Sequence, residues 1–135
     1  MAALDDVLTS IDAFGAALRA RDLAAGEGVW ALDREDLVIL GSAAGEEFVG
    51  REAVRACLAA LFSRPTSHDW RWGDRRISIV GDVAWFVAAD APYQTGHPDG
   101  SVTERPYRVT GVLVHGDGGW RWTQYHGSEP LGSIG

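Results

Sequence analysis

The sequence predicts an α+β fold in which three N-terminal helices pack on a curved, mainly antiparallel sheet that ends in a four-strand meander. Two patterns carry this prediction. Apolar residues recur at helical spacing in much of the first half of the chain, whereas the second half alternates strand-like runs with glycine turns. With 135 residues, of which 46% are hydrophobic, the chain can bury one core, so we expect a single domain over residues 1–135.

Three segments of the first half are expected to be helical. The first covers residues 4–18, and its apolar face consists of Leu4, Val7, Leu8, Ile11, Phe14 and Leu18. Asp22 can cap a second, shorter helix that extends to Trp30, although two glycines weaken it. A third helix covers residues 51–62 and ends shortly before Pro65.

The remaining segments are expected to be strands and turns. Residues 36–40 form a short apolar run typical of a strand, and the small residues of 41–50 predict a loop. Three turn signals then leave four strands, near residues 67–80, 83–95, 102–115 and 119–128. Tight turns join antiparallel neighbours, so these strands predict a meander. Strands of this length curve, and we expect bends or bulges at Pro92, Pro106 and Gly111.

The turn lengths assign the meander side chains to two faces. They place Ile79 opposite Ala84, Phe86 opposite Gly111, and Gly111 opposite Thr123. The first face contains Ile77, Ile79, Ala84, Phe86, Ala88, Asp90, Tyr107, Val109, Leu113, Thr123 and Tyr125. The second contains Trp85, Val87, Ala89, Arg108, Thr110, Val112, Trp120, Trp122, Gln124 and His126. A register error of one residue would exchange the faces of a strand.

The second face of the meander is also rich in apolar residues. Because the helices can cover only one face, we expect this face to contact another subunit. The expected homodimer contact consists of Trp85, Val112, Trp120 and Trp122.

The charge and the single cysteine restrict the class of partner and the compartment. A net charge of −7 and a pI near 4.9 argue against nucleic acid or an anionic membrane as a partner. Cys57 is alone, which excludes an internal disulfide and fits a reducing cytoplasm. There is neither a signal-peptide pattern nor an apolar run of about 18 residues, so we expect a cytoplasmic protein without a membrane span.

Several motifs, in this order of elements, resemble the nuclear transport factor 2-like superfamily and, within it, the SnoaL-like group. They are the helix start Gly50-Arg51-Glu52-Ala53-Val54, the turn from Gly81-Asp82 to Ala84, the strand with Arg108 and Thr110, Trp120, and the ending His126-Gly127-Ser128-Glu129-Pro130. The resemblance implies a cone-shaped domain, usually dimeric, with a pocket between the helices and the concave sheet. It implies no single reaction, because members include isomerases, cyclases, dehydratases and non-catalytic association domains.

The isomerase branch of the superfamily can be tested against particular residues. Ketosteroid isomerases use a tyrosine on the first helix, an aspartate base and a second acidic hydrogen-bond donor. The positions that match these residues hold Phe14, Leu40, and Thr110 or Gly111. Phenylalanine cannot donate a proton to an oxyanion and leucine cannot abstract one, so we expect this chemistry to be absent.

Candidate site residues come from the first face and the helices that cover it. We expect the pocket to bind a small apolar molecule through Phe14, Trp30, Phe86, Asp90, Tyr107 and Tyr125. The candidates for acid–base catalysis are Asp90, Tyr125 and His126. Each has a structural alternative: core packing for the aromatic residues, a polar cluster for Asp90 and the tyrosines, and a hydrogen-bonded histidine at the subunit contact for His126.

Metal and cofactor sites are not expected. The four histidines are scattered, without a metal-binding interval. The glycines from Gly116 to Gly119 lack the following helix that a phosphate loop needs. Two hypotheses therefore remain, a non-catalytic binding or association module and a lyase or isomerase that uses general acid–base catalysis. They differ in one observable, whether a carboxylate or an imidazole points into the cavity.

Overall fold

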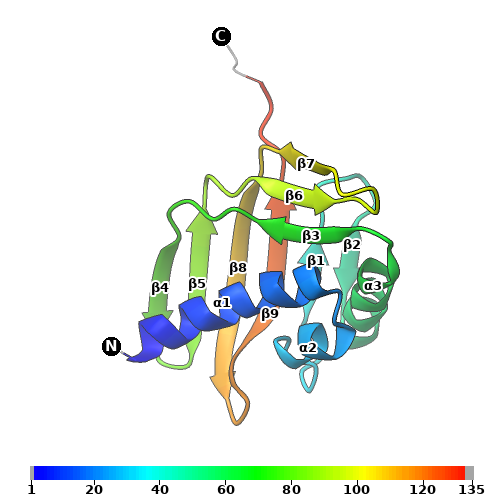
Figure 1. Cartoon of the computed structure of the whole chain (residues 1–135). Helices are drawn as coiled ribbons and strands as arrows, with labels where there is room; N and C mark the ends of the chain where they lie inside the picture. Colours follow the sequence, from blue (N-terminus) through cyan, green and yellow to red (C-terminus); the bar gives the residue numbers. More distant parts are fainter. Residues whose placement is uncertain (1, 133–135) are drawn as a thin grey trace.

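The computed structural model describes residues 2–132 and confirms the α+β fold. Its elements are α1 (Ala2–Ala20), α2 (Leu23–Gly28), β1 (Val38–Leu40), β2 (Glu47–Val49), α3 (Arg51–Ser63), β3 (Ser67–Trp70), β4 (Arg76–Val80), β5 (Val83–Ala88), β6 (Tyr93–Gly96), β7 (Val102–Arg105), β8 (Arg108–Gly116) and β9 (Gly119–Ser128). Helix α1 lies across one face of the sheet, α2 packs against α1, and α3 packs against α2 and β2 (Figure 1). Within the described residues, no helix is both long and apolar enough to cross a membrane.

The strands form two sheets rather than one. The larger sheet has six strands in the order β2-β1-β9-β8-β5-β4, and the smaller has three in the order β3-β6-β7. Each of the first three predicted meander strands is broken in two, so that one part joins each sheet. Pro92 and Pro106 lie in two of the breaks, as predicted, because proline has no N–H to continue a ladder. The third break contains Gly73, whose amide donates to the carbonyl of Asp90 at 2.8 Å.

Two predictions for the segment between the helices were wrong. The predicted loop at residues 41–50 contains strand β2, which pairs antiparallel with β1. The second helix ends at Gly28 and does not reach Trp30. Trp30 instead forms a β-bridge to Trp122, which competes with the glycine-weakened helix for this stretch of backbone.

The predicted register is confirmed for β4 with β5 and for β5 with β8, and is off by one residue in the β6–β7 hairpin and wrong for the last pair. Ile79 pairs with Ala84 and Phe86 pairs with Gly111, as expected. Gly111, however, pairs with Tyr125, because the last turn has two residues and β9 bulges at Thr123. A turn one residue shorter than predicted moves the start of β9 to the opposite face, and the bulge returns its end to the predicted one.

Trp120 and Trp122 consequently lie on the inner face of the sheet and not on the outer face. Only 8% of Trp120 and none of Trp122 is exposed. The homodimer contact predicted from the sequence therefore loses both of these residues. Trp85, at 43% exposed, and the half-buried Val112 stay on the outer face.

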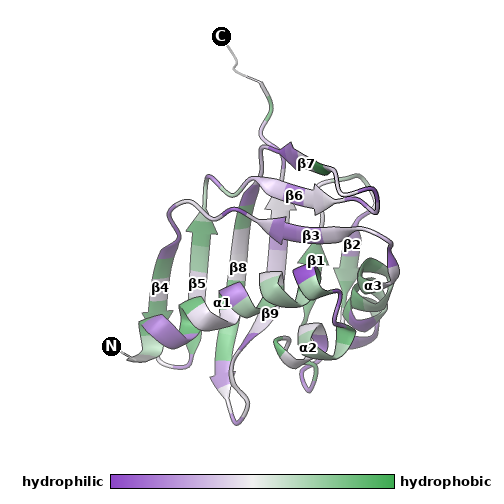
Figure 2. Cartoon of the chain, in the orientation of Figure 1, coloured by the Kyte–Doolittle hydropathy of each residue, from purple (hydrophilic) through white to green (hydrophobic). Residues whose placement is uncertain are grey.

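The centre of the core is a group of closely packed aromatic rings. Trp122 stacks on Trp30 with a ring-centroid distance of 6.0 Å and meets Phe86 edge-on at 5.5 Å. Gly111 allows this packing, since a Cβ atom there would lie 2.5 Å from Phe86 Cε1 and 2.7 Å from Trp122 Cζ3. A bend or bulge was predicted at Gly111, and the register shift of the β8–β9 pair lies between the next two residues, Val112 and Leu113. Strand β5, which carries Phe86, is mostly hydrophobic, whereas β3 and β6 are mostly hydrophilic (Figure 2).

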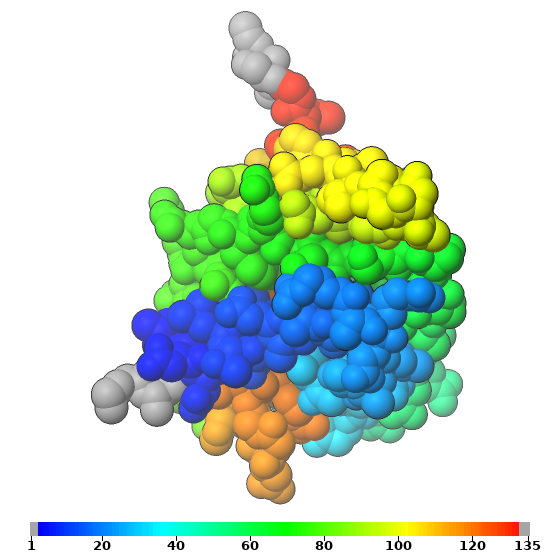
Figure 3. Space-filling model, viewed as in Figure 1, coloured from blue at the N-terminus to red at the C-terminus, as the bar shows by residue number. Residues whose placement is uncertain are grey.

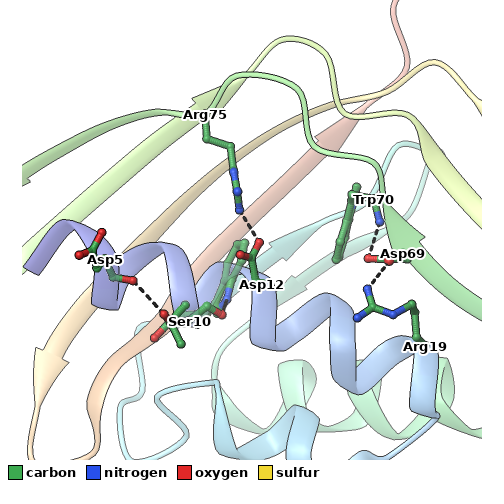
Figure 4. A network of polar contacts seen from close by, with 9 residues as sticks. Asp5, Ser10, Asp12, Arg19, Asp69, Trp70 and Arg75 are labelled. Atoms are coloured by element: carbon green, nitrogen blue, oxygen red, sulfur yellow. Dashed lines mark hydrogen bonds and ion pairs between the residues drawn. The ribbon is translucent and has the colours of Figure 1, made fainter. Parts of the chain in front are cut away.

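Ion pairs attach α1 to β3 and to the loop that follows it. Arg19 of α1 pairs with Asp69 of β3, and Arg75 of the loop pairs with Asp12 of α1 (Figure 4). The Asp69 carboxylate also accepts a hydrogen bond of 2.8 Å from the backbone N–H of Trp70. Strand β3 is thus held against α1, with the β6–β7 hairpin beyond it (Figure 3).

Candidate functional site

A cavity of about 580 Å³ lies beside the small sheet. Its walls come from α1, α3, the β1–β2 hairpin, β3, the β6–β7 hairpin and the residues around the far ends of β8 and β9. The apolar and aromatic part of the wall includes Phe14, Leu18, Ile39, Phe48, Leu58, Leu61, Trp70, Tyr93, Tyr107 and Tyr125. The polar part includes Glu46, Arg64, Thr66, His68, Thr95, His97, Thr103 and Arg105. The volume and this composition are those of a small-molecule site.

His68 is a buried imidazole in the cavity wall. It is 6% exposed, and its ring stacks on that of Tyr93 at a centroid distance of 5.5 Å. Nε2 shares a hydrogen bond of 3.0 Å with the Thr66 hydroxyl, whereas Nδ1 is buried and has no hydrogen-bond partner among residues 2–132. Burial, and then the positive charges of Arg64 and Arg105, lower the pKa of His68 to about 4. His68 is therefore neutral near pH 7.

Trp70 lies two residues further along β3 and faces the same cavity. It is 5% exposed, and its indole Nε1–H also lacks a hydrogen-bond partner in the described part of the chain. Side chains two apart on a strand point to the same side, so both residues of the β3 pair, His68 and Trp70, border the cavity, and each has a buried nitrogen atom without a partner among the described residues.

The sequence pattern does not predict His68 or Trp70 as a site residue, because the four histidines show no metal-binding interval. The available signal was the alternation within Ser67–Trp70, which puts both side chains on one face of a strand. What the sequence alone does not give is that this face turns toward a cavity.

Three tyrosines form another part of the wall. The rings of Tyr93 and Tyr107 lie 5.2 Å apart, and Tyr125 packs against Trp70 at 5.7 Å. Burial, and then the neighbouring Tyr107, raises the pKa of both Tyr93 and Tyr125, so these two hydroxyls keep their protons. The Trp70 indole opposes this shift at Tyr125, although its N–H makes no well-formed hydrogen bond with that hydroxyl.

Gly127 makes room for the tyrosines. A Cβ atom at Gly127 would lie 2.4 Å from the hydroxyl oxygen of Tyr107 and 2.6 Å from that of Tyr125. The two hydroxyls consequently come close to the backbone of β9, a position that a larger residue would exclude.

The structure distributes the predicted site residues over three regions. Phe14, Tyr107 and Tyr125 line the cavity, as expected. Trp30 and Phe86 are buried in the core, each at 1% exposed, and do not line it. Asp90 is exposed in the bend after β5, where it borders a separate shallow depression with Pro92 and Pro106. It leaves the cavity because β5 ends at Ala88, two residues before Asp90, whereas the sequence predicted one strand over residues 83–95.

His126 lies on the exposed outer side of β9. The sequence placed it on that face, and the structure keeps it away from the cavity. It therefore does not act within the cavity, and of the three predicted catalytic candidates only Tyr125 borders it.

The charged groups of the wall are two arginines and one glutamate. Arg105 lies 3.6 Å from Glu129 and 5.7 Å from the centre of the Tyr93 ring. Arg64 makes no ion pair with any described residue. Glu46 accepts a hydrogen bond of 2.8 Å from the backbone N–H of Ala43. The cavity wall is thus locally more cationic than the chain as a whole, whose net charge is −7.

The chain matches one known protein family. The family profile of the SnoaL-like domain matches residues 7–132. The chain belongs to the SnoaL-like domain family. No curated protein sequence matches it.

Solved structures agree with a SnoaL-like domain of the nuclear transport factor 2-like fold. A candidate dehydratase of the NTF2-like family from Streptomyces avermitilis has a TM-score of 0.81 at 21% identity, covering 96% of this chain and 97% of the other. A candidate aromatic ring hydroxylase from Novosphingobium aromaticivorans has a TM-score of 0.75 at 21% identity, covering 95% and 91%. A ketosteroid isomerase-like protein from Erwinia carotovora atroseptica has a TM-score of 0.69 at 17% identity, covering 95% and 96%. At these identities the likeness concerns the fold.

Proposed function

We propose that this SnoaL-like domain binds a small, mainly apolar molecule in the cavity beside the small sheet. The observation that carries the proposal is the wall itself. Aromatic rings border a space of about 580 Å³, and polar side chains of β3 and the β6–β7 hairpin border the same space. Sites for small molecules combine these two features, because burial of the apolar body drives binding and the polar atoms fix its orientation.

A second candidate function is general acid–base catalysis, as in a lyase or an isomerase. Its support is the His68 imidazole, a titratable group with an open nitrogen in the cavity wall. Protonated Tyr125 can act as the proton donor. The names of two structural neighbours, dehydratase and ketosteroid isomerase-like, point the same way. The chemistry differs from that of ketosteroid isomerases, because Phe14 faces the cavity without a proton to donate.

The binding proposal is tested by thermal shift across a library of metabolites. A ligand present at about 100 times its Kd adds about 2.7 kcal/mol to the free energy of unfolding, so at least one compound raises the melting temperature in a concentration-dependent way. Ala60 and Ala59 on α3 provide a matched pair, since both are exposed and only Ala60 borders the cavity. Ala60→Trp should abolish the shift and Ala59→Trp should keep it. A library without a single reproducible shift refutes the proposal.

The catalytic alternative is tested on the compounds that bind. Each is incubated with the protein and analysed for a product by mass spectrometry or by loss of a chromophore. His68→Gln should lower the rate by about a hundredfold or more if His68 transfers a proton. Turnover that is unchanged in His68→Gln refutes this role for the imidazole.

We infer a homodimer through the outer face of the six-stranded sheet. Its exposed apolar side chains are Val80, Val83, Trp85 and Val87, with exposed fractions of 66%, 40%, 43% and 45%. A patch of this kind is typical of a protein contact. Sedimentation should show a dimer, and Trp85→Glu should give a monomer. Val102→Glu, on the exposed strand β7, is the control that should stay dimeric. A wild-type monomer at micromolar concentration refutes the inference.

A further inference from the structure

The polar end of the ligand can be identified from the cavity wall, an inference that rests on the proposed binding function. We propose that the cavity selects a small molecule with an apolar body and one carboxylate, and that the carboxylate binds at the β3 pair, His68 and Trp70. The proposed site has three parts: two unpartnered nitrogen atoms, their place in side chains on one side of β3, and the charge around them.

The first part is the lack of partners at a buried donor. The Trp70 indole N–H can only donate, and it is buried without an acceptor among residues 2–132. Such an atom destabilises the folded protein unless something supplies an acceptor. Trp30 has the same unpartnered N–H, but it packs against Phe14 and Trp122 and does not line this cavity. Trp70, unlike Trp30, belongs to the cavity wall.

The second part is the geometry of β3. His68 and Trp70 are two residues apart on the strand, which puts their Cα atoms roughly 7 Å apart with both side chains on one side. The Thr66 hydroxyl can donate to His68 Nε2, a tautomer in which Nδ1 carries the proton. Both open nitrogens are then donors. A carboxylate has two acceptor oxygens and can satisfy both at once.

Strand β3 is held in this orientation from outside the cavity. Asp69, between the two side chains, pairs with Arg19 of α1 (Figure 4). Gly15 of α1 allows the close approach, because a Cβ atom there would lie 2.5 Å from the Asp69 carboxylate. The donors are therefore fixed before a ligand arrives, which lowers the cost of ordering them on binding.

The third part is the sign of the charge. Arg64 and Arg105 both border the cavity, and their positive charges act on His68. The same charges that disfavour a second cation at His68 favour an anion beside it. Glu46 also borders the cavity, and Glu129 lies 3.6 Å from Arg105. Arg64, however, makes no ion pair with any described residue, so its positive charge remains for an anion. An anionic group is hence favoured over a neutral amide of the same shape.

The test uses three probes of one shape: naphthalene-2-carboxylate, 2-naphthamide and 2-naphthylmethylamine. Calorimetry should show the carboxylate binding at least about tenfold tighter than the amide, since hydrogen bonds to a charged group are the stronger ones, and the amine binding weakest. Trp70→Phe removes the N–H and keeps a ring, and it should weaken carboxylate binding about tenfold. Trp85→Phe, on the outer face, should leave it unchanged.

A measurement on the wild-type protein covers the case in which Trp70→Phe does not fold. The imidazole of His68 titrates near 4 in the free protein, and NMR should show its pKa rising when naphthalene-2-carboxylate binds and not when 2-naphthamide binds. Equal affinities for acid and amide, or a His68 pKa that does not respond to the acid, overturn the carboxylate site and leave the binding function intact. If neither the probes nor the metabolite library bind, the proposed function fails and the carboxylate site with it.

Discussion

The core and the cavity of this SnoaL-like domain are built from the same kinds of side chain and differ in how their polar atoms are used. In the core, the indole N–H of Trp122 donates to the carbonyl of Ser10 at 3.3 Å, and Gly111 lets two rings close around it. At the cavity, the indole N–H of Trp70 has no partner among the described residues, and neither has Nδ1 of His68. The core also holds one unpartnered N–H, that of Trp30, but it lies among aromatic rings, whereas Trp70 and His68 border the cavity and keep hydrogen-bonding capacity in its wall.

The largest expected effect comes from opening the core. Trp122→Ala removes a fully buried ring and should lower the free energy of unfolding by about 3–5 kcal/mol in urea denaturation. Trp85→Ala, on the outer face, should cost less than about 1 kcal/mol in a monomer. If the two substitutions cost the same, the inner position of Trp122 is wrong.

The next effect is a pH dependence of stability that comes from His68 in the cavity wall. Because the folded pKa of His68 is about 4 and its ordinary value is 6.5, the unfolded state binds more protons between these values, and stability falls as the pH falls. Between about pH 7 and about pH 5 this loss amounts to about 2 kcal/mol. His68→Gln should lose that much less than the wild type over the same interval. His126→Gln, at an exposed position, should lose as much stability as the wild type. If the free energy of unfolding of His68→Gln falls with pH as steeply as that of the wild type, the prediction is wrong.

A smaller effect is expected at the tyrosines of the cavity wall, where one substitution should lower both stability and ligand binding. Gly127→Ala places a methyl group against the hydroxyls of Tyr107 and Tyr125 and should cost about 1–2 kcal/mol of stability. Because both tyrosines border the cavity, any ligand found by thermal shift should bind more weakly as well. Gly28→Ala is the control, since nothing lies within 4 Å of that position, and it should stabilise the protein slightly. Ligand binding that survives Gly127→Ala unchanged would place the ligand away from the tyrosines.

The smallest effect is a change of reactivity. Burial raises the pKa of the Cys57 thiol to about 11, so alkylation by iodoacetamide should be slow near pH 8 and accelerate as the pH approaches that value. Cys57 borders the cavity, and a bound ligand should slow the reaction further. Rapid alkylation at neutral pH, measured by mass spectrometry, would contradict the burial of this wall.

The fold could be predicted because its signals are local. Helical periodicity identified α1 and α3, and glycine turns identified the order of the meander strands. The pairing of β4 with β5 followed from the turn length. The pairing of β5 with β8 matched the prediction although the β6–β7 hairpin did not, since Gly96 pairs with Val102, one residue off the register of the predicted two-residue turn. The last pairing failed by one residue in the turn, and Trp120 and Trp122 changed faces with it, because the side-chain period of a strand is two.

The site could be predicted only in part, because it depends on where strands bend. Tyr107 and Tyr125 were placed correctly, since the bulge at Thr123 restored the predicted face at the end of β9. Asp90 was misplaced because β5 stops before it. His68 was overlooked because its strand belongs to the second sheet, whose position no local pattern encodes.

The breaks at Pro92 and Pro106 separate the β6–β7 hairpin from the strands of the larger sheet, so the hairpin is a suitable place to redesign the cavity. The β6–β7 hairpin lies beyond both prolines and supplies Thr95, His97 and Thr103 to the cavity wall. None of these three is among the buried core residues. A library randomised at these positions can therefore change what the cavity accepts while the residues that fold the chain remain constant.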